Sequence, residues 1–113
     1  MKRALFIGRW QPLHPGHKWL FNQKLDQNIP ILIAVRDTPV DENNPFSTDQ
    51  VVLNLEKEYV NEVESGMVKV IPIPDIESVN YGRGVGYAIN EFVPPKDIGQ
   101  ISATEIRKNI KKE

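Results

Sequence analysis

The feature that most constrains the fold is an alternation of short apolar runs with segments of helical periodicity. Residues 4–7 read Ala-Leu-Phe-Ile and residues 31–35 read Ile-Leu-Ile-Ala-Val. Continuous apolar runs of this length are typical of strands buried on both faces of a parallel sheet. Residues 68–73 predict a third strand, and Pro72 and Pro74 place it at a sheet edge or at a carboxyl end.

Helical patterns fill the intervals between these strands. Apolar residues in the range 17–26 predict a short helix with one broad apolar side. Ser47 and Gln50 form a capping box at the start of a second helix. That helix is expected to end at Gly66, which suits the left-handed position that follows a last helical turn.

The remaining segments are a loop and two further helices. Residues 37–46 hold prolines, asparagines and acidic residues and predict a loop. A glycine-rich stretch precedes a short helix expected over residues 87–92. A second capping box, Ser102 with Glu105, predicts a last helix. The order of elements indicates a single Rossmann-like α/β domain over residues 1–113, with an open, mostly parallel sheet flanked by helices.

Composition excludes several classes of protein. A chain of 113 residues fits one domain. The absence of cysteine excludes disulfides and thiolate metal sites, and a net charge of −1 argues against a nucleic-acid partner. No apolar run is long enough to span a membrane. We therefore expect a cytoplasmic protein without nucleic-acid or membrane partners, whose modest core leaves room for a homodimer.

The segment GRWQPLHPGH, residues 8–17, holds both histidines of the chain. It follows the first strand directly and leads into the first helix, so it lies at the carboxyl end of the sheet, where open α/β folds bind ligands. We expect the helix to begin near His17 and its free backbone N–H groups to favour an anion. His14 and His17 have no carboxylate partners at metal-ligand spacing, so no metal site is expected.

A second segment, ISATEIR at residues 101–107, supports two interpretations. It is compatible with a capped surface helix that carries a solvated arginine. The hydroxyl groups of Ser102 and Thr104, nearby backbone N–H groups and Arg107 one turn later could equally hold a polyphosphate. The segment alone does not separate the two.

Together, GRWQPLHPGH and ISATEIR resemble the nucleotidyltransferase superfamily with its HxGH and ISxTxxR motifs. The GRxQPxHxGH form is more similar to nicotinamide mononucleotide adenylyltransferases than to cytidylyltransferases. The stretches NPFS, residues 44–47, and IPIPDI, residues 71–76, are also similar to that branch. The resemblance covers most of the chain and implies a cytidylyltransferase-like domain over residues 1–113.

The resemblance also implies roles for individual residues. His14, His17 and Arg107 would be the catalytic groups: the histidines would contact the α-phosphate of a bound nucleotide and stabilise the charge that develops in the transition state. Arg107 would hold the departing β- and γ-phosphates with Ser102 and Thr104. The other nucleotide-binding positions are Gly8, Arg9, Gln11 and Gly16. The nucleotide would be ATP, carrying Mg²⁺, and no protein nucleophile is needed because the phosphate of the acceptor attacks in line.

Two departures from the family pattern keep alternatives open. The cytidylyltransferase RTEGIS signature is absent before Ile101, which disfavours CTP. Full-length relatives carry another strand and helix where this chain has only residues 94–100. A cytidylyltransferase, a sulfate-activating relative and a non-catalytic nucleotide-binding module therefore remain alternatives to an adenylyltransferase.

The acceptor is expected to be a small molecule that carries a phosphate, and three residues are candidates to bind it. Arg36 follows the second strand at the ligand edge of the sheet. Arg83 stands between glycines and could bind a phosphate, although a flexible turn is the commoner explanation of GRGVG. Trp10 could stack on a ring, but packing against the core is its more frequent role.

Overall fold

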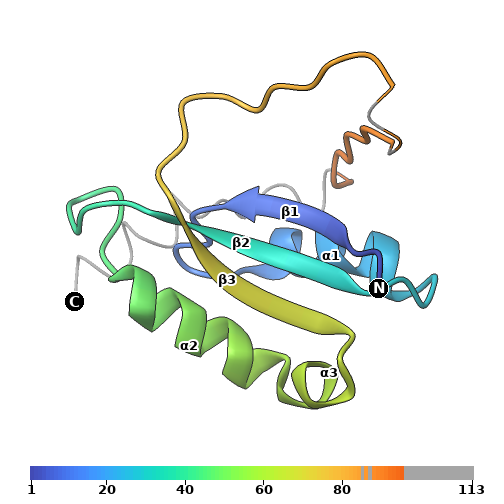
Figure 1. Ribbon diagram of the computed structural model, residues 1–113. Coiled ribbons are helices and arrows are strands. Elements are labelled where there is room, and N and C mark those ends of the chain that lie inside the picture. Colours follow the sequence, from blue (N-terminus) through green and yellow to red (C-terminus); the bar gives the residue numbers. More distant parts are fainter. Residues whose placement is uncertain (85, 87, 96–113) are drawn as a thin grey trace.

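The computed structural model describes residues 1–84, 86 and 88–95 and contains one parallel sheet (Figure 1). Its strands are β1 (Ala4–Gly8), β2 (Ile31–Asp37) and β3 (Val68–Pro74), in the order β1-β2-β3. Ala4 and Val68 both lie opposite Ile31, which sets the register of the two pairs. The predicted parallel α/β sheet is thus confirmed over these three strands, and the chain has a Rossmann-like arrangement.

Three helices connect the strands: α1 (Pro15–Leu25), α2 (Thr48–Glu58) and α3 (Val60–Ser65). The connections from β1 to β2 and from β2 to β3 each lead to the next strand in the same direction across the sheet. Because such crossovers are right-handed, α1 and α2 lie on the same face of the sheet. The ring of Phe21 on α1 accordingly meets that of Tyr59 at the end of α2, with centroids 5.9 Å apart. No helix in the described residues is long and apolar enough to cross a membrane.

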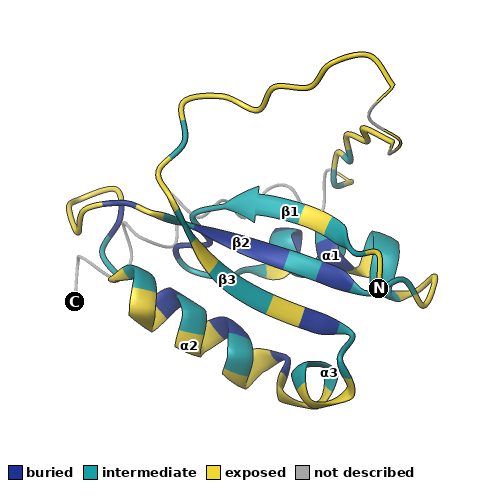
Figure 2. Ribbon diagram, viewed as in Figure 1, coloured by how far each residue is buried: buried dark blue, intermediate teal, exposed yellow. Residues whose placement is uncertain are grey.

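The core lies between this face of the sheet and the two longer helices (Figure 2). β2 is its centre, because alternate residues of a strand point to the same face, and Ile31, Ile33 and Val35 are fully buried there. Phe21 and Leu55 close the core from α1 and α2. Burial of side chains of this size stabilises the fold by roughly 1.5–3 kcal/mol each.

The long helix expected between Ser47 and Gly66 is divided. Its start is confirmed, since the Ser47 hydroxyl accepts a hydrogen bond from the Gln50 N–H at 3.2 Å. The predicted capping box is incomplete, because the Gln50 side chain donates to Oδ1 of Asn54 at 2.7 Å and does not cap Ser47 in return. Tyr59 then leaves helical geometry, with φ −114° and ψ 35°, and its side chain is buried in the core. Helical geometry resumes in α3, which ends before Gly66. The φ of 86° at Gly66 confirms the predicted left-handed position.

The segment after β3 differs from the prediction. Residues 88–92 form no helix, so the helix expected over residues 87–92 is wrong for the part that is described. Ile89 and Val93 are largely exposed, and without an apolar face to bury, a helix this short is not stable in water. Pro94 and Pro95 also disfavour helical geometry before them. The helix expected after Ser102 lies outside the described residues.

Candidate active site

The segment GRWQPLHPGH lies at the carboxyl end of β1 and turns directly into α1 (Figure 1). α1 begins at Pro15, two residues before the start expected near His17. His14 is its N-cap residue, with extended backbone at φ −141° and ψ 172°. Proline is favoured at the first helical position, so Pro15 was the signal that could have located this start.

The two histidines form a reciprocal helix cap. Nδ1 of His14 accepts a hydrogen bond from the N–H of Gly16 at 3.0 Å. Nδ1 of His17 accepts one from the N–H of His14 at 3.4 Å. This arrangement is the capping box known for serine and glutamate, built here from two imidazoles. The Nδ1 atom of each ring therefore accepts a hydrogen bond from the backbone.

The rings of His14 and His17 stack on each other, with centroids 3.7 Å apart and planes 27° apart. Burial lowers the pKa of His14 below its ordinary value of 6.5. Burial, followed by repulsion from a charged His14, lowers the pKa of His17 to about 3. Both imidazoles are therefore neutral at physiological pH.

The backbone N–H groups at the start of α1 are already paired, which corrects the expectation of free donors there. Pro15 has no N–H, and that of Gly16 is bound by His14. The N–H groups of His17 and Lys18 donate to the carbonyl oxygen of His14 at 3.0 and 3.2 Å. An anion at this helix end therefore has to be held mainly by side chains.

Trp10 fixes the loop beneath the histidines. Its φ of 52° lies in the left-handed region, which is uncommon for a bulky residue. The indole N–H donates to the carbonyl oxygen of Ala34 on β2 at 3.1 Å, and the ring meets the edge of His17 with centroids 4.9 Å apart. Trp10 is only 7% exposed, so its side chain packs inward and supports His17.

Gly8 and Gly16 are needed where side chains come close to the backbone. A Cβ on Gly8 would lie 2.9 Å from Cε2 of Trp10, and a Cβ on Gly16 would lie 2.8 Å from Cε1 of His14. Both distances are too short for a stable contact. These glycines therefore allow the close packing of Trp10 and His14, a role that sequence reasoning did not assign to them.

Arg9 and Gln11 join this loop to the loop between β2 and α2. The Arg9 guanidinium donates to Oδ1 of Asn44 at 3.3 Å. Oε1 of Gln11, whose side chain is buried, accepts from the N–H of Phe46 at 2.9 Å. The two loops at the carboxyl end of the sheet are thus held together. Asn44 is a site component that the sequence analysis did not identify.

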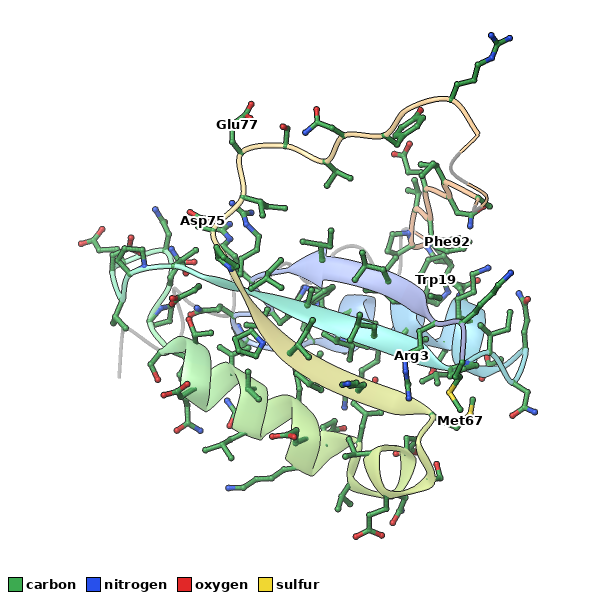
Figure 3. The ribbon with its side chains drawn as sticks, in the orientation of Figure 1. Arg3, Trp19, Met67, Asp75, Glu77 and Phe92 are labelled. Atoms are coloured by element: carbon green, nitrogen blue, oxygen red, sulfur yellow. The ribbon has the colours of Figure 1, made fainter. Side chains whose placement is uncertain are left out.

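Arg36, predicted to bind the acceptor, is engaged by a carboxylate. Its Nε and one terminal nitrogen both donate to Oδ1 of Asp75, at 2.9 and 2.7 Å, where the chain leaves β3 (Figure 3). The same terminal nitrogen lies 3.4 Å from the carbonyl oxygen of Ile76. Arg36 therefore anchors the outgoing chain at the ligand edge of the sheet.

Arg83 is not brought to the histidines. Residues 75–84 leave the carboxyl end of the sheet and run past β1, and residues 88–95 lie near α1, where Nζ of Lys24 lies 6.0 Å from the centre of the Phe92 ring (Figures 1 and 3). Arg83 lines a wide, open hollow of about 600 Å³ formed by this segment itself, with Tyr81 and Gly84 among its neighbours.

The other predicted phosphate ligands, Ser102, Thr104 and Arg107, lie outside the described residues. Within the described part of the chain, no group of three or more histidine, aspartate or glutamate side chains could hold a metal ion. The site that can be built from the structure is therefore the pair of neutral imidazoles, with Arg9 and Gln11 in the loop that carries them.

Comparison with known proteins finds no matching family model, but several related proteins. A nicotinamide-nucleotide adenylyltransferase of Caldivirga maquilingensis is 33% identical over 99 residues, which cover 84% of this chain and 53% of that relative. One from Pyrococcus furiosus is 35% identical over 83 residues, or 67% of this chain and 43% of the relative. A phosphopantetheine adenylyltransferase of Chromobacterium violaceum is 33% identical over 89 residues, or 76% and 50%.

These relatives agree in one respect and differ in another. All three carry the name of an adenylyltransferase, whereas the named acceptors are different molecules. The chain spans about half the length of the curated relatives it matches. The similarity therefore shows membership of the adenylyltransferase family and points to no single acceptor.

Proposed function

This chain is a homologue of the adenylyltransferases of the nucleotidyltransferase superfamily, and from that premise we propose that it transfers a nucleotidyl group, AMP by preference, to a small acceptor that carries a phosphate. An oxygen of the acceptor phosphate attacks the α-phosphorus of the nucleotide. The bond from that phosphorus to the β-phosphate oxygen breaks, and pyrophosphate leaves with the electron pair of that bond.

The observation that carries this proposal is the histidine pair at the carboxyl end of β1. Nε2 of His14 and Nε2 of His17 have no hydrogen-bond partner among the described residues, whereas both Nδ1 atoms are bound. Among the described residues, the only buried side-chain polar atom without a hydrogen-bond partner is Oγ1 of Thr38. The two unpaired Nε2 atoms are therefore not buried, and both are accessible. Two fixed donors at one edge of the sheet suit a phosphate on which negative charge increases during reaction.

The remaining roles are part of the same proposal. Arg9 lies in the loop beside the histidines and would turn toward a phosphate, exchanging its 3.3 Å contact with Asn44 for a charged partner. Ser102, Thr104 and Arg107 would hold the β- and γ-phosphates. Mg²⁺ would come with the nucleotide, since the described residues offer no cluster of ligands for it, and it would shield the charge of the triphosphate.

A specific observation favours a second candidate, a nucleotide-binding module without transferase activity. The three residues considered for acceptor binding are not assembled: Trp10 is buried, Arg36 is paired with Asp75, and Arg83 lies in the segment that runs away from the site. Such a module would bind ATP through the histidine loop and would release no pyrophosphate.

Two measurements test the proposal. Thermal unfolding with ATP, CTP, GTP or UTP and Mg²⁺ should show the largest rise in melting midpoint with ATP, because a ligand at about 100 times its Kd stabilises by about 2.7 kcal/mol. Pyrophosphate release should then be measured with ATP and a panel of phosphomonoesters, nicotinamide mononucleotide first, with sulfate included. A larger shift with CTP would overturn the preference for AMP. Binding without turnover across the panel would favour the module.

A further inference from the structure

The turn of residues 41–44, in the loop between β2 and α2, holds the side chain of Asn44 in one place. Asn44 is only 6% exposed. Its backbone N–H donates to Oδ1 of Asp41 at 2.8 Å, and its Nδ2 donates to the same oxygen at 3.1 Å. The backbone N–H of Asn43 also donates to this oxygen, at 2.8 Å. One carboxylate oxygen therefore closes the turn and fixes the amide of Asn44.

The charge of Asp41 determines which end of that amide faces Arg9. Partial desolvation would raise the pKa of Asp41, but the hydrogen bonds from Asn44 and Asn43 outweigh it and hold the pKa below its usual value. The carboxylate is therefore ionised at neutral pH and can only accept hydrogen bonds. Nδ2 of Asn44 must face it, so Oδ1 of Asn44 faces the other way and accepts from the Arg9 guanidinium at 3.3 Å.

The partner that Arg9 has in this position is uncharged. Among the described residues, the ion pairs are Lys18–Glu58 and Arg36–Asp75, so no carboxylate neutralises Arg9. A carboxylate would add the attraction of an opposite charge and could accept two parallel hydrogen bonds, whereas an amide carbonyl does neither. We propose that Asn44 is a positioning residue for Arg9, which holds the guanidinium in place without neutralising it, so that a phosphate can replace Asn44 as its partner.

This inference rests on the proposed function for the identity of the anion. There, Arg9 exchanges its contact with Asn44 for a phosphate of the nucleotide, and the exchange is favourable because the partner that is lost carries no charge. The fixed amide also restricts Arg9 before the nucleotide binds, which reduces the entropy lost on binding. Asp41 acts on Arg9 through Asn44. The loop between β2 and α2 thus contributes to the phosphate site from a neighbouring strand end.

An exchange of the two side chains tests the role of charge. The double variant Asp41→Asn/Asn44→Asp keeps the net charge of the chain. The amide at position 41 can still accept from the backbone N–H groups of the turn and can donate to the new carboxylate. We expect this variant to bind ATP with Mg²⁺ about 10-fold more weakly in a calorimetric titration, because Arg9 is then held by an opposite charge. Its melting midpoint without nucleotide should stay close to that of the unaltered protein. Unchanged ATP affinity in the folded variant would overturn the proposal.

The same exchange in an Arg9→Ala background separates positioning from simple repulsion. A carboxylate that only repelled the nucleotide would weaken ATP binding at least as much without Arg9. We expect the loss to be much smaller in Arg9→Ala, and an equal or larger loss there would contradict the proposal. If the exchanged variant does not fold, Asn44→Ala replaces it. Its loss of ATP affinity, of up to about 10-fold, should likewise disappear in Arg9→Ala, and an equal loss in both backgrounds would contradict the proposal.

A measurement without nucleotide keeps this inference distinct from the proposed function. Should the unaltered protein bind no ATP, the proposed function would fail. Denaturant titrations of Arg9→Ala, the exchanged variant and their combination would still measure the coupling between Arg9 and residue 44. We expect that coupling to be stronger with aspartate than with asparagine at position 44. An equal or weaker coupling with aspartate would show that Asn44 does not hold Arg9 as an uncharged partner.

Discussion

The loop of residues 9–14 and the segment of residues 75–95 both leave the carboxyl end of a strand, yet they are built in opposite ways. The loop after β1 is short and is fixed by the hydrogen bond that Trp10 donates and by those that the side chains of Gln11 and His14 accept. The described residues of segment 75–95 after β3 are mostly exposed, and the Arg36–Asp75 pair anchors the start of the segment. The histidine pair, for which we propose the role of meeting developing charge, is thus preorganised, whereas the residues considered for the acceptor are not assembled.

The largest difference between the loop after β1 and segment 75–95 should appear in how far substitutions lower the free energy of unfolding. Phe21 is fully buried and meets Phe6, Trp10 and Tyr59 ring to ring. Phe21→Ala should lower the free energy of unfolding by about 3–5 kcal/mol in a denaturant titration, because it leaves a cavity beneath the histidine loop.

The control for this variant lies in the exposed segment. Val79 is 64% exposed, so Val79→Ala should change the free energy of unfolding by less than about 0.5 kcal/mol. A loss with Val79→Ala as large as that with Phe21→Ala would show that segment 75–95 is packed against the domain, and the contrast would be lost.

The three strands and the limits of the helical segment between β2 and β3 could be predicted from the sequence, because they follow from hydrophobic patterns and local end signals. The strands at residues 4–8 and 31–37 contain continuous apolar runs, the strand at residues 68–74 has apolar residues at intervals, and Ser47 and Gly66 are local signals that need no tertiary information. The break at Tyr59 was not predictable in this way, because it comes from packing against Phe21, which is distant in sequence. The helix expected at residues 87–92 is wrong over the described residues 88–92, because helical spacing alone does not provide a surface on which to pack.

The position of the candidate site at the carboxyl end of β1 was predicted from the sequence, whereas the contacts that build it were not, and its role stays a prediction. The spacing of His14 and His17 and their place after β1 indicated a phosphate site. Their reciprocal cap depends on imidazole geometry, and histidine is not among the usual capping residues. The partnership of Arg36 with Asp75 joins residues 39 positions apart, which no local pattern reveals.

Two glycines offer a smaller and more local test of the same contrast. Gly8→Ala places a methyl group 2.9 Å from the Trp10 indole, so the ring must move, and His17 with it. We expect a loss of about 1–3 kcal/mol in stability together with reduced pyrophosphate release.

Gly82→Ala is the matched variant in segment 75–95, where a new Cβ would meet nothing within 4 Å. Its melting midpoint and its turnover should stay close to those of the unaltered protein. If Gly8→Ala also left the melting midpoint and the turnover unchanged, Trp10 would not fix the loop as described.

The pH dependence of stability should report the buried histidine. The pKa of His17 is lowered from 6.5 to about 3 in the folded protein, so the unfolded chain binds more protons once the pH falls below 6.5. Folding stability is therefore lost progressively as pH falls from about 6.5 toward 3, and the loss at pH 5 should be about 2 kcal/mol. Denaturant titrations at pH 7 and pH 5 measure it. His17→Asn should show a smaller difference between the two pH values, and an unchanged difference would place the titrating group elsewhere.

The smallest effect is expected at the anchor of segment 75–95. The side chains of Arg36 and Asp75 are 31% and 50% exposed, so solvent screens their attraction. Asp75→Asn should cost less than about 1 kcal/mol in stability and should leave ATP binding unchanged, while Arg36 becomes free to bind an anion. A large fall in ATP affinity in this variant would place the nucleotide, and not the acceptor, beside Arg36.

The central claim is that the loop between β1 and α1 holds the phosphates of a nucleotide. The most direct test is an NMR titration with ATP and Mg²⁺ that follows each backbone amide and both imidazoles of ¹⁵N-labelled protein. We predict the largest signal changes at Gly16, at the imidazoles of His14 and His17 and at Arg9, with little change at residues 79–84. Saturation with unchanged signals throughout residues 8–17, or with changes confined to residues 79–84, would contradict the account.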